Sequence, residues 1–422
     1  MRTVPMLPLE GFVTLSTRRT GDLKFIQELN RSIILDTIRK HGPISRSEIA
    51  KLNKLSPTTV TTAIQELIKE ELVCEGAPTA SSGGRKPIPV SFSPDGRFII
   101  GISITNSVVT IGQLNLVPEV NKKRCYKVEN KCGDQFIEFL LTIIDNFLEH
   151  ICLKEKCLGI SIIAPGVLNF ENGIILYSSK LNLVDIPLKE MIENRFGLKT
   201  WLDSDTNAVA LAEKELGAYQ GFNTILNIMV GDGVGAGIVL NETIFRGHQG
   251  GAGEFGHTVV EIGGIPCECG NQGCLENYVS LPAIAAQIKT RLINGESSLL
   301  EELLEDDDAN LTPELIDKAY RHYDPLVVQV VDKAILFFST ALVNLVNLFN
   351  PDLIILGGVF FQNNSGLVSK ISQLVHEKGI NTNTKTLKIS SSSLGQDFEL
   401  LAAANMVLHS EFSFSFTHSK NL

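Results

Sequence analysis

The chain has 422 residues, of which 44% are hydrophobic and 20% charged, and its formal net charge is −10. This length exceeds one hydrophobic core, so two or three domains are expected in a globular protein. Eight cysteines are too few for a disulfide scaffold, and neither a signal peptide nor a membrane-spanning segment is evident, so we expect a reducing cytoplasm and no membrane partner.

The net charge is unevenly distributed along the chain. Residues 1–90 contain 13 Lys and Arg against 9 Asp and Glu, whereas the remainder contains 24 against 38. A basic N-terminal part can dock on phosphates while the rest of the chain repels them. The overall acidity therefore does not exclude nucleic acid as a partner.

The first 92 residues predict a DNA-binding domain preceded by an arm. Residues 1–22 lack apolar periodicity and are expected to be flexible. From Leu23 apolar residues recur every three or four positions up to about His41, which predicts an amphipathic helix. We expect residues 23–92 to form a winged helix-turn-helix.

Two capping signals predict where the second and third helices begin. Ser45 is followed three residues later by Glu48, the pattern of a capping box. Ser56 precedes Pro57, which suits the first helical position because its missing N–H is not needed there. The apolar segments 72–75 and 87–92 then predict the two strands of a wing.

Short hydroxyl and basic side chains gather at the starts of these helices and between the wing strands. Hydroxyls at a helix N-terminus suit close approach to a DNA backbone or base edge, and arginine in a flexible loop suits a narrow minor groove. The predicted DNA contacts are Ser45, Arg46, Ser56, Thr58, Thr59, Thr61, Thr62, Arg85 and Lys86. The alternative is a helical interaction module whose threonines are merely solvated.

Beyond Arg97 the chain predicts an α/β architecture with two related halves. An order of strand, strand, helix and strand recurs more loosely in the second half, and such alternation is typical of α/β folds. The predicted elements are 98–104, 108–114, 136–151 and 157–163 in the first half, and 224–230, 235–240 and 353–358 in the second.

One histidine and three cysteines predict a metal site. His257, Cys267, Cys269 and Cys274 fall within eighteen residues, and an imidazole with thiolates is a ligand set of structural Zn²⁺. The alternative is buried cysteines beside a glycine-rich turn. Glu254 and Glu276 flank the ligands, so a bound metal would hold both acids and the free face of His257 together, as acceptors for sugar hydroxyls.

Four motifs together resemble the ROK family of repressors, open reading frames and kinases, over about residues 20–410. They are Gly253–His257 with Cys267–Glu276, Trp201–Ala208, Gly231–Gly237 and Leu394–Asp397. The resemblance implies a two-lobed, actin-like (ribonuclease H-like) sugar-kinase fold, zinc held by the four predicted ligands, a sugar site in the cleft, and a homodimer or tetramer. We expect lobes at 97–215 and 216–410, with the zinc loop and a helical region in the second, and a tail at 411–422.

The resemblance also implies roles for individual residues. Asp205 occupies the position of the base that removes a proton from the sugar hydroxyl in the kinases, and Asp205, Glu254, His257 and Glu276 are expected to contact a sugar.

Three loops depart from the kinase pattern. Residues 103–108 lack the kinases' Asp-x-Gly-Gly-Thr-Lys, a Gly-Thr-Gly becomes Gly231–Gly233 with Asp232 at its centre, and a Pro-Asn-Leu sugar loop becomes Ser179–Leu181. An Asp within ~4 Å of a phosphate charge costs between ~1 and ~4 kcal/mol. We therefore expect ATP not to bind, and no catalytic residues.

A winged helix in front of such a domain resembles the repressor branch, of which the xylose and N-acetylglucosamine repressors are the familiar types. The sequence thus predicts a cytoplasmic repressor that binds double-stranded operator DNA, responds to a sugar or sugar phosphate, and controls carbohydrate genes, for example for xylose. The alternatives are an ATP-dependent sugar kinase with an appended DNA-binding domain, and an interaction protein that docks through its acidic lobe.

Overall fold

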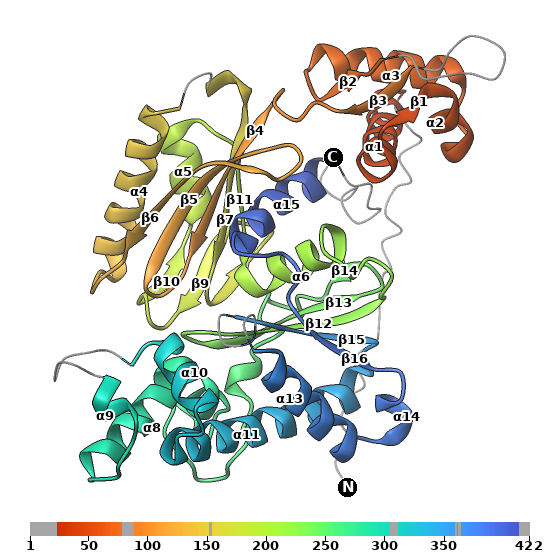
Figure 1. Ribbon diagram of the computed structural model, residues 1–422. Coiled ribbons are helices and arrows are strands. Elements are labelled where there is room, and N and C mark those ends of the chain that lie inside the picture. The colour runs from red at the N-terminus through yellow and green to blue at the C-terminus, as the bar shows by residue number, and fades with distance from the viewer. Residues whose placement is uncertain are drawn as a thin grey trace, which may run out of the picture. The chain divides into compact units, whose positions relative to one another are not determined.

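The computed structural model describes residues 23–77, 88–151, 154–303, 311–358, 361 and 364–412 (Figure 1). They form two compact units, one from the described residues up to Phe92 and one from Ser93 to Glu411. The predicted arm, the basic wing loop with Arg85 and Lys86, and most of the predicted tail lie outside the described residues.

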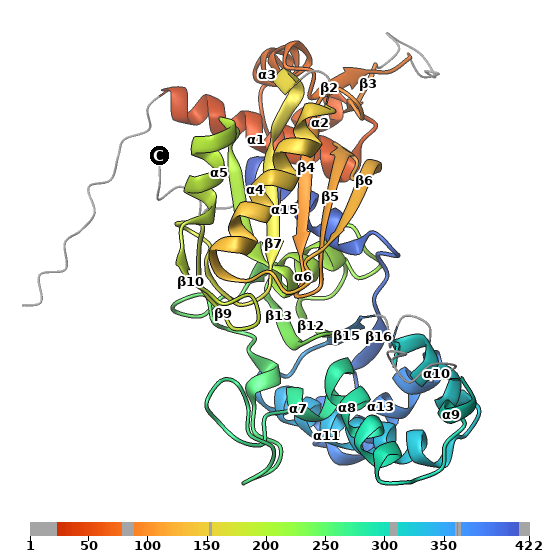
Figure 2. The ribbon, with the colours of Figure 1, turned by 90° about the vertical axis from the view of Figure 1, so that its left-hand side faces the viewer.

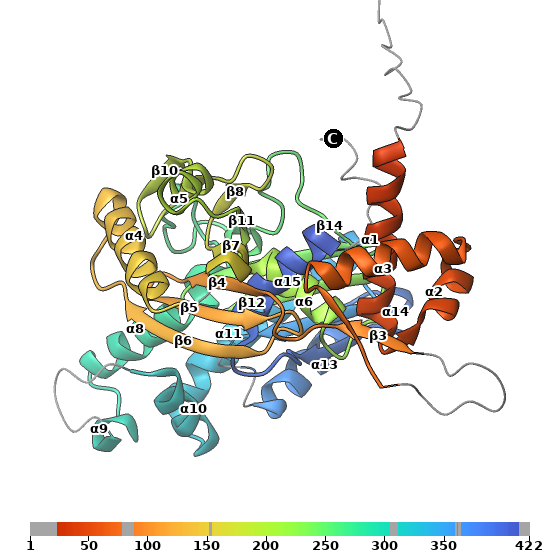
Figure 3. The ribbon, with the colours of Figure 1, turned by 90° about the horizontal axis from the view of Figure 1, so that it is seen from above.

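The smaller unit is a winged helix, as the sequence predicts. Its three helices pack against one another (Figure 3), and its antiparallel sheet has the strand order β1-β3-β2. Its elements are α1 (Leu23–His41), β1 (Ile44–Ser45), α2 (Arg46–Asn53), α3 (Pro57–Lys69), β2 (Val73–Glu75) and β3 (Pro89–Phe92). The two-residue strand β1 was not predicted, because its sequence also carries the cap of α2.

Both predicted helix caps are confirmed. Ser45 accepts a hydrogen bond from the Glu48 backbone N–H while the Glu48 carboxylate accepts from the Ser45 N–H at 2.9 Å, which closes the capping box. At the start of α3, the Ser56 hydroxyl accepts from the Thr59 N–H at 3.0 Å, and Pro57 occupies the first helical position.

The larger unit contains two five-stranded sheets of the same topology. In each sheet the first three strands of the half form an antiparallel meander, and two further strands then add in parallel beside the first of them. The strand orders are β6-β5-β4-β7-β11 and β14-β13-β12-β15-β16. This repetition confirms the predicted relation between the two halves.

The strands of the two sheets and of a smaller third one have the following bounds. The first sheet comprises β4 (Phe98–Ile104), β5 (Val108–Asn115), β6 (Val120–Lys127), β7 (Cys157–Ala164) and β11 (Thr200–Ser204). The second comprises β12 (Thr224–Val230), β13 (Val234–Leu240), β14 (Thr243–Ile244), β15 (Leu353–Gly357) and β16 (Lys388–Ser391). A separate three-stranded sheet comprises β8 (Val167–Asn169), β9 (Ile174–Ser178) and β10 (Leu183–Ile186).

The first sheet is covered on both faces, which explains the continuous apolar run of β4. Successive strand residues point to opposite faces. Ile100, Ile102 and Ile104 belong to the core that also contains residues of α4 (Gly133–Glu149) and α5 (Leu188–Phe196) (Figure 2). On the other face, a Cβ added to Gly101 would meet Ala403 of α15 (Phe398–Phe412) at 3.4 Å.

Two helices are exchanged between the halves. Helix α6 (Asp205–Glu215) follows the last strand of the first sheet but packs on β12 and β13 of the second, where Gly237 lets it approach closely (Figure 1). Helix α15 follows the last strand of the second sheet but packs on the first. The predicted lobes are continuous segments of the chain, 97–215 and 216–410. In the structure, each of these segments contributes one helix to the sheet of the other.

The second sheet shares its core with a layer of helices, and the predicted helical region of the second lobe forms part of this layer. Its members are α8 (Leu281–Ile293), α9 (Leu300–Leu303), α10 (Pro313–Arg321), α11 (Pro325–Phe349), α13 (Ser365–Lys378) and α14 (Asn381–Thr384). Helix α11 is long and apolar enough to cross a membrane, but 56% of its apolar window is buried in the fold. It packs against α8, α10 and α13, as a core helix does.

The packing of α6 on β13 predicts the effect of one substitution. In Gly237→Ala the new Cβ would lie 2.1 Å from the Thr206 carbonyl oxygen and 2.7 Å from Ala210 Cβ, so the helix must move. Overpacking of this kind costs roughly 1–3 kcal/mol, so we expect a lower melting temperature. Gly221→Ala is the matched control, because nothing lies within 4 Å of its added Cβ. Equal melting temperatures for the two variants would contradict this packing.

Candidate functional site

The larger unit contains a pocket of about 440 Å³ formed by residues of both halves. All four residues predicted to contact a sugar line it. Asp205 is the first residue of α6, Glu254 and His257 lie in the turn of η2 (Phe255–His257), and Glu276 is the first residue of α7 (Glu276–Val279).

The carboxyl group of Asp205 has a strongly raised pKa. Burial, the largest cause, raises the pKa of Asp205 to about 7, and the neighbouring charges of Glu399 and Glu254 raise it further. The Thr206 backbone N–H donates to the carboxylate at 2.7 Å and acts in the opposite direction. Near neutral pH this group can accept or donate a proton to a ligand hydroxyl.

Glu254, His257 and Glu276 form the adjoining wall. Burial and the charge of Glu276 raise the pKa of Glu254, while His257 lowers it. The Nε2 atom of His257 lies 3.9 Å from the Glu254 carboxylate. Glu276 accepts a hydrogen bond from the Val234 N–H at 2.8 Å, which fixes its carboxylate at the pocket edge.

Glu399 was missed by the sequence-based prediction. It lies at the start of α15 and lines the pocket, where burial raises its pKa. Its carboxylate accepts a hydrogen bond from Ser103 at 2.9 Å. This bond joins the start of the exchanged helix α15 to the end of strand β4. No local motif marks Glu399.

An ion pair joins the two halves beside the pocket. Asp203, a buried residue of β11, pairs with Arg246 from the loop after β14. The Arg246 guanidinium also stacks over the Phe170 ring, 4.2 Å from its centroid. This loop continues to Glu254, so the contacts help to position that acid.

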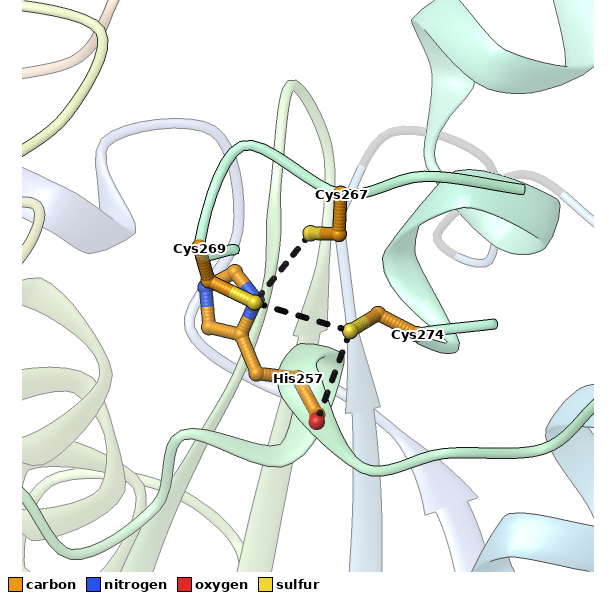
Figure 4. A group of neighbouring side chains, drawn as sticks. All are labelled: His257, Cys267, Cys269 and Cys274. Carbon is orange, nitrogen blue, oxygen red and sulfur yellow. Dashed lines mark hydrogen bonds between the residues drawn. The ribbon is translucent and has the colours of Figure 1, made fainter. Parts of the chain in front are cut away.

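The four predicted metal ligands converge (Figure 4). One ligand atom of each lies within 4.8 Å of all the others. Cys269 Sγ lies 3.7 Å from Cys274 Sγ, and Cys267 Sγ lies 3.6 Å from His257 Nδ1. A tetrahedral Zn²⁺ with Zn–S of ~2.3 Å and Zn–N of ~2.0–2.1 Å has edges of roughly 3.8 and 3.6 Å. The donor set and spacing therefore fit a metal ion at this cluster.

In the winged helix, several predicted DNA contacts also serve the fold. The buried Ser45 and the exposed Ser56 cap their helices. Arg46 donates to the Thr61 carbonyl at 3.3 Å and pairs with Glu75 at 2.7 Å.

The outer face of α3 is polar and accessible. Thr59 shares a hydrogen bond with Ser56, and the Thr61 hydroxyl donates to the Pro57 carbonyl. The exposed residues of α3 are Pro57, Thr58, Thr62, Gln65, Glu66 and Lys69. Thr58, Thr62, Gln65 and Lys69 share one face of the helix. Gln65 and Lys69 were not among the predicted DNA contacts. They follow Thr58 by seven and eleven residues, which is close to two and three helical turns, so they lie on the same face of α3.

Paired sheets of one topology, exchanged helices and a shared acidic pocket define the larger unit as a two-lobed, actin-like domain of the sugar-kinase type. The ROK family profile matches residues 107–410, and the MarR family profile matches residues 29–74, within the winged helix. The chain belongs to the ROK family.

Individual relatives include both regulators and kinases. A xylose repressor from Caldicellulosiruptor bescii is 30% identical, over 93% of this chain and 99% of that protein. The crystal structure of a ROK family transcriptional regulator, a homologue of the E. coli MLC protein, superposes with a TM-score of 0.79 at 30% identity, covering 92% and 98% of the two chains. A ROK family glucokinase from Streptomyces griseus, in complex with glucose and AMPPNP, superposes with a TM-score of 0.65 at 25% identity, covering 73% and 98%.

The pKa of Asp205 predicts a pH-dependent effect of Asp205→Asn. Because the folded-state pKa of about 7 lies above the ordinary 3.8, ionisation of Asp205 destabilises the fold progressively between these pH values. The amide removes this penalty. We expect its stabilising effect to be larger at pH 8 than at pH 5, by roughly 1–3 kcal/mol in urea unfolding.

The control is Asp95→Asn, which changes an exposed aspartate elsewhere in the same unit. An effect of Asp205→Asn that is the same at both pH values would contradict the raised pKa.

Proposed function

We propose that this protein is a transcriptional repressor whose affinity for operator DNA is set by a sugar bound in the pocket. The observation that carries the proposal is the joining, in one chain, of a winged helix and a pocket lined by five carboxylates. Fixed acceptors of this kind suit the hydroxyl donors of a sugar. The regulators among its relatives support the same function.

Each pocket residue has a role in this proposal. Asp205 and Glu254 accept hydrogen bonds from sugar hydroxyls, and Glu276 does so with the oxygen lone pairs that Val234 leaves free. His257 uses Nε2, since its Nδ1 faces the cysteines. Glu399 completes the ring of acceptors from the side of α15.

The same four-residue cluster would hold a structural Zn²⁺. Such an ion supplies no chemistry to a ligand, but it fixes the loop between His257 and Cys274. Glu254 and Glu276 flank that loop, so metal binding would support the sugar site. Thiolate ligands also agree with the expected cytoplasmic location.

A sugar kinase with an appended DNA-binding domain is the second candidate function, favoured by the pKa of Asp205, which suits a general base. Phosphoryl transfer also requires donors that cradle the nucleotide phosphates. Here Ser103 is engaged with Glu399, and Asp232 brings a negative charge to the Gly231–Gly233 turn. We therefore propose that the protein senses a sugar without phosphorylating it.

Operator binding is proposed to use a symmetric dimer or a tetramer. Two winged helices would present α3 to successive major grooves about 34–36 Å apart. A sugar that prefers one state of the pocket would change that spacing, with a coupling free energy of roughly 1–3 kcal/mol.

This function predicts which DNA duplexes the protein selects and how sugars change its affinity for them. Selection from random duplexes should enrich an inverted repeat with half-sites about one helical turn apart. A panel of glucose, N-acetylglucosamine, xylose, fructose and allose should contain a sugar that changes the affinity for that duplex by about 5- to 150-fold. Gln65→Ala should weaken binding, whereas Gln373→Ala, at an exposed glutamine of α13 in the other unit, should not.

A coupled assay for ADP on the same sugars separates the two candidate functions. Turnover at ordinary kinase rates would contradict the sensor proposal, as would a DNA affinity that no sugar changes.

Metal analysis tests the cluster. We expect about one zinc per chain, and Cys267→Ser should lose it, melt at a lower temperature and bind sugar more weakly. Cys132→Ser, at an exposed cysteine outside the cluster, should retain the metal. Unchanged sugar binding by a metal-free protein would refute a positioning role for the ion.

A further inference from the structure

The three loops that depart from the kinase pattern meet at the pocket. The Ser107 hydroxyl, from the loop after β4, donates to the Asp232 carboxylate at 3.0 Å. The Lys180 ammonium, from the loop between β9 and β10, donates to the Asp232 carbonyl oxygen at 2.7 Å. We call Ser107, Lys180 and Asp232 the cross-cleft bridge.

The bridge joins the two halves at the accessible part of the pocket. Ser107 and Lys180 belong to the first half and Asp232 to the turn between β12 and β13 of the second. All three line the pocket; Ser107 and Lys180 are exposed and Asp232 is half-buried. A ligand that reaches Asp205 therefore lies in the same cavity as the bridge.

Negatively charged side chains outnumber positively charged ones around this cavity. The described lining residues include five carboxylates but one lysine, Lys180. The lysine donates to the backbone of Asp232, while the Asp232 carboxylate accepts from the neutral Ser107. The remaining N–H groups of Lys180 can contact an anionic ligand, but that ligand also faces five carboxylates, and Asp232 is the one beside the lysine.

We propose that the cross-cleft bridge makes the pocket selective for uncharged sugars, and that Asp232 is the specificity-determining residue that rejects phosphorylated ones. This inference rests on the proposed sugar-sensing function and names its ligand class. The physical basis is the repulsion between the half-buried Asp232 carboxylate and a phosphate group bound in the same cavity.

Calorimetric titration with matched pairs tests the proposal. The full-length protein is titrated with each sugar of the panel and its phosphate: glucose, N-acetylglucosamine, fructose and allose with their 6-phosphates, and xylose with its 5-phosphate. For the pair whose free sugar binds most tightly, we expect the phosphate to bind at least about tenfold more weakly, a difference of about 1.4 kcal/mol. The difference in affinity between the sugar and its phosphate should decrease as the salt concentration rises.

Asp232→Asn isolates the charge. The amide oxygen can still accept from Ser107, so the bridge is kept while the repulsion is lost, and the sugar-to-phosphate affinity ratio should fall by at least about fivefold. Asp95→Asn, away from the pocket, should leave the ratio unchanged.

A phosphate that binds more tightly than its sugar, or a ratio that Asp232→Asn does not lower, would overturn the inference while leaving sugar sensing intact. Binding of neither member of any pair would overturn the proposed function together with the inference.

Discussion

The gathering of five carboxylates in one half-buried pocket is the constraint around which the larger unit is built. Acids gather in a half-buried cavity only where the fold fixes each of them separately. Here Asp205 accepts from the Thr206 N–H, Glu276 from the Val234 N–H and Glu399 from Ser103. These bonds fix three of the five acids but leave oxygen lone pairs free. Burial is the largest cause of the raised pKa of Asp205, and the charges of Glu399 and Glu254 raise it further. Hydroxyl donors of a ligand can stabilise these acids.

The exchange of α6 and α15 between the halves is what brings acids from distant parts of the chain together. Asp205 begins the helix that leaves the first sheet for the second, and Glu399 is the second residue of the helix that returns. The pocket therefore lies where both exchanged helices start. A change in the angle between the halves would alter the separation of these two carboxylates, so ligand binding and domain movement share one location. The convergence of His257 with Cys267, Cys269 and Cys274 lies in the same segment, between Glu254 and Glu276.

Features with a local signal could be predicted from the sequence. The caps at Ser45 and Ser56, the hairpin of β4 and β5, and the convergence of His257 with the three cysteines all follow from spacing alone. Edge strand β6 was missed because its side chains are largely polar and exposed. Glu399, Arg246 and the cross-cleft bridge were missed because their partners are far away in sequence, and no periodicity encodes such contacts. The sequence-based prediction named residues 103–108, 179–181 and 231–233 separately, whereas the hydrogen bonds of Asp232 join these three loops.

A crystal structure of the protein grown with a binding sugar and a non-hydrolysable ATP analogue tests the central claim most directly. The account predicts sugar hydroxyls within hydrogen-bond distance of Asp205, Glu254, His257 and Glu276, and no nucleotide at the turn of Gly231–Gly233, where Asp232 still contacts Ser107. Nucleotide phosphates seated on that turn, with Asp232 displaced from Ser107, would contradict it.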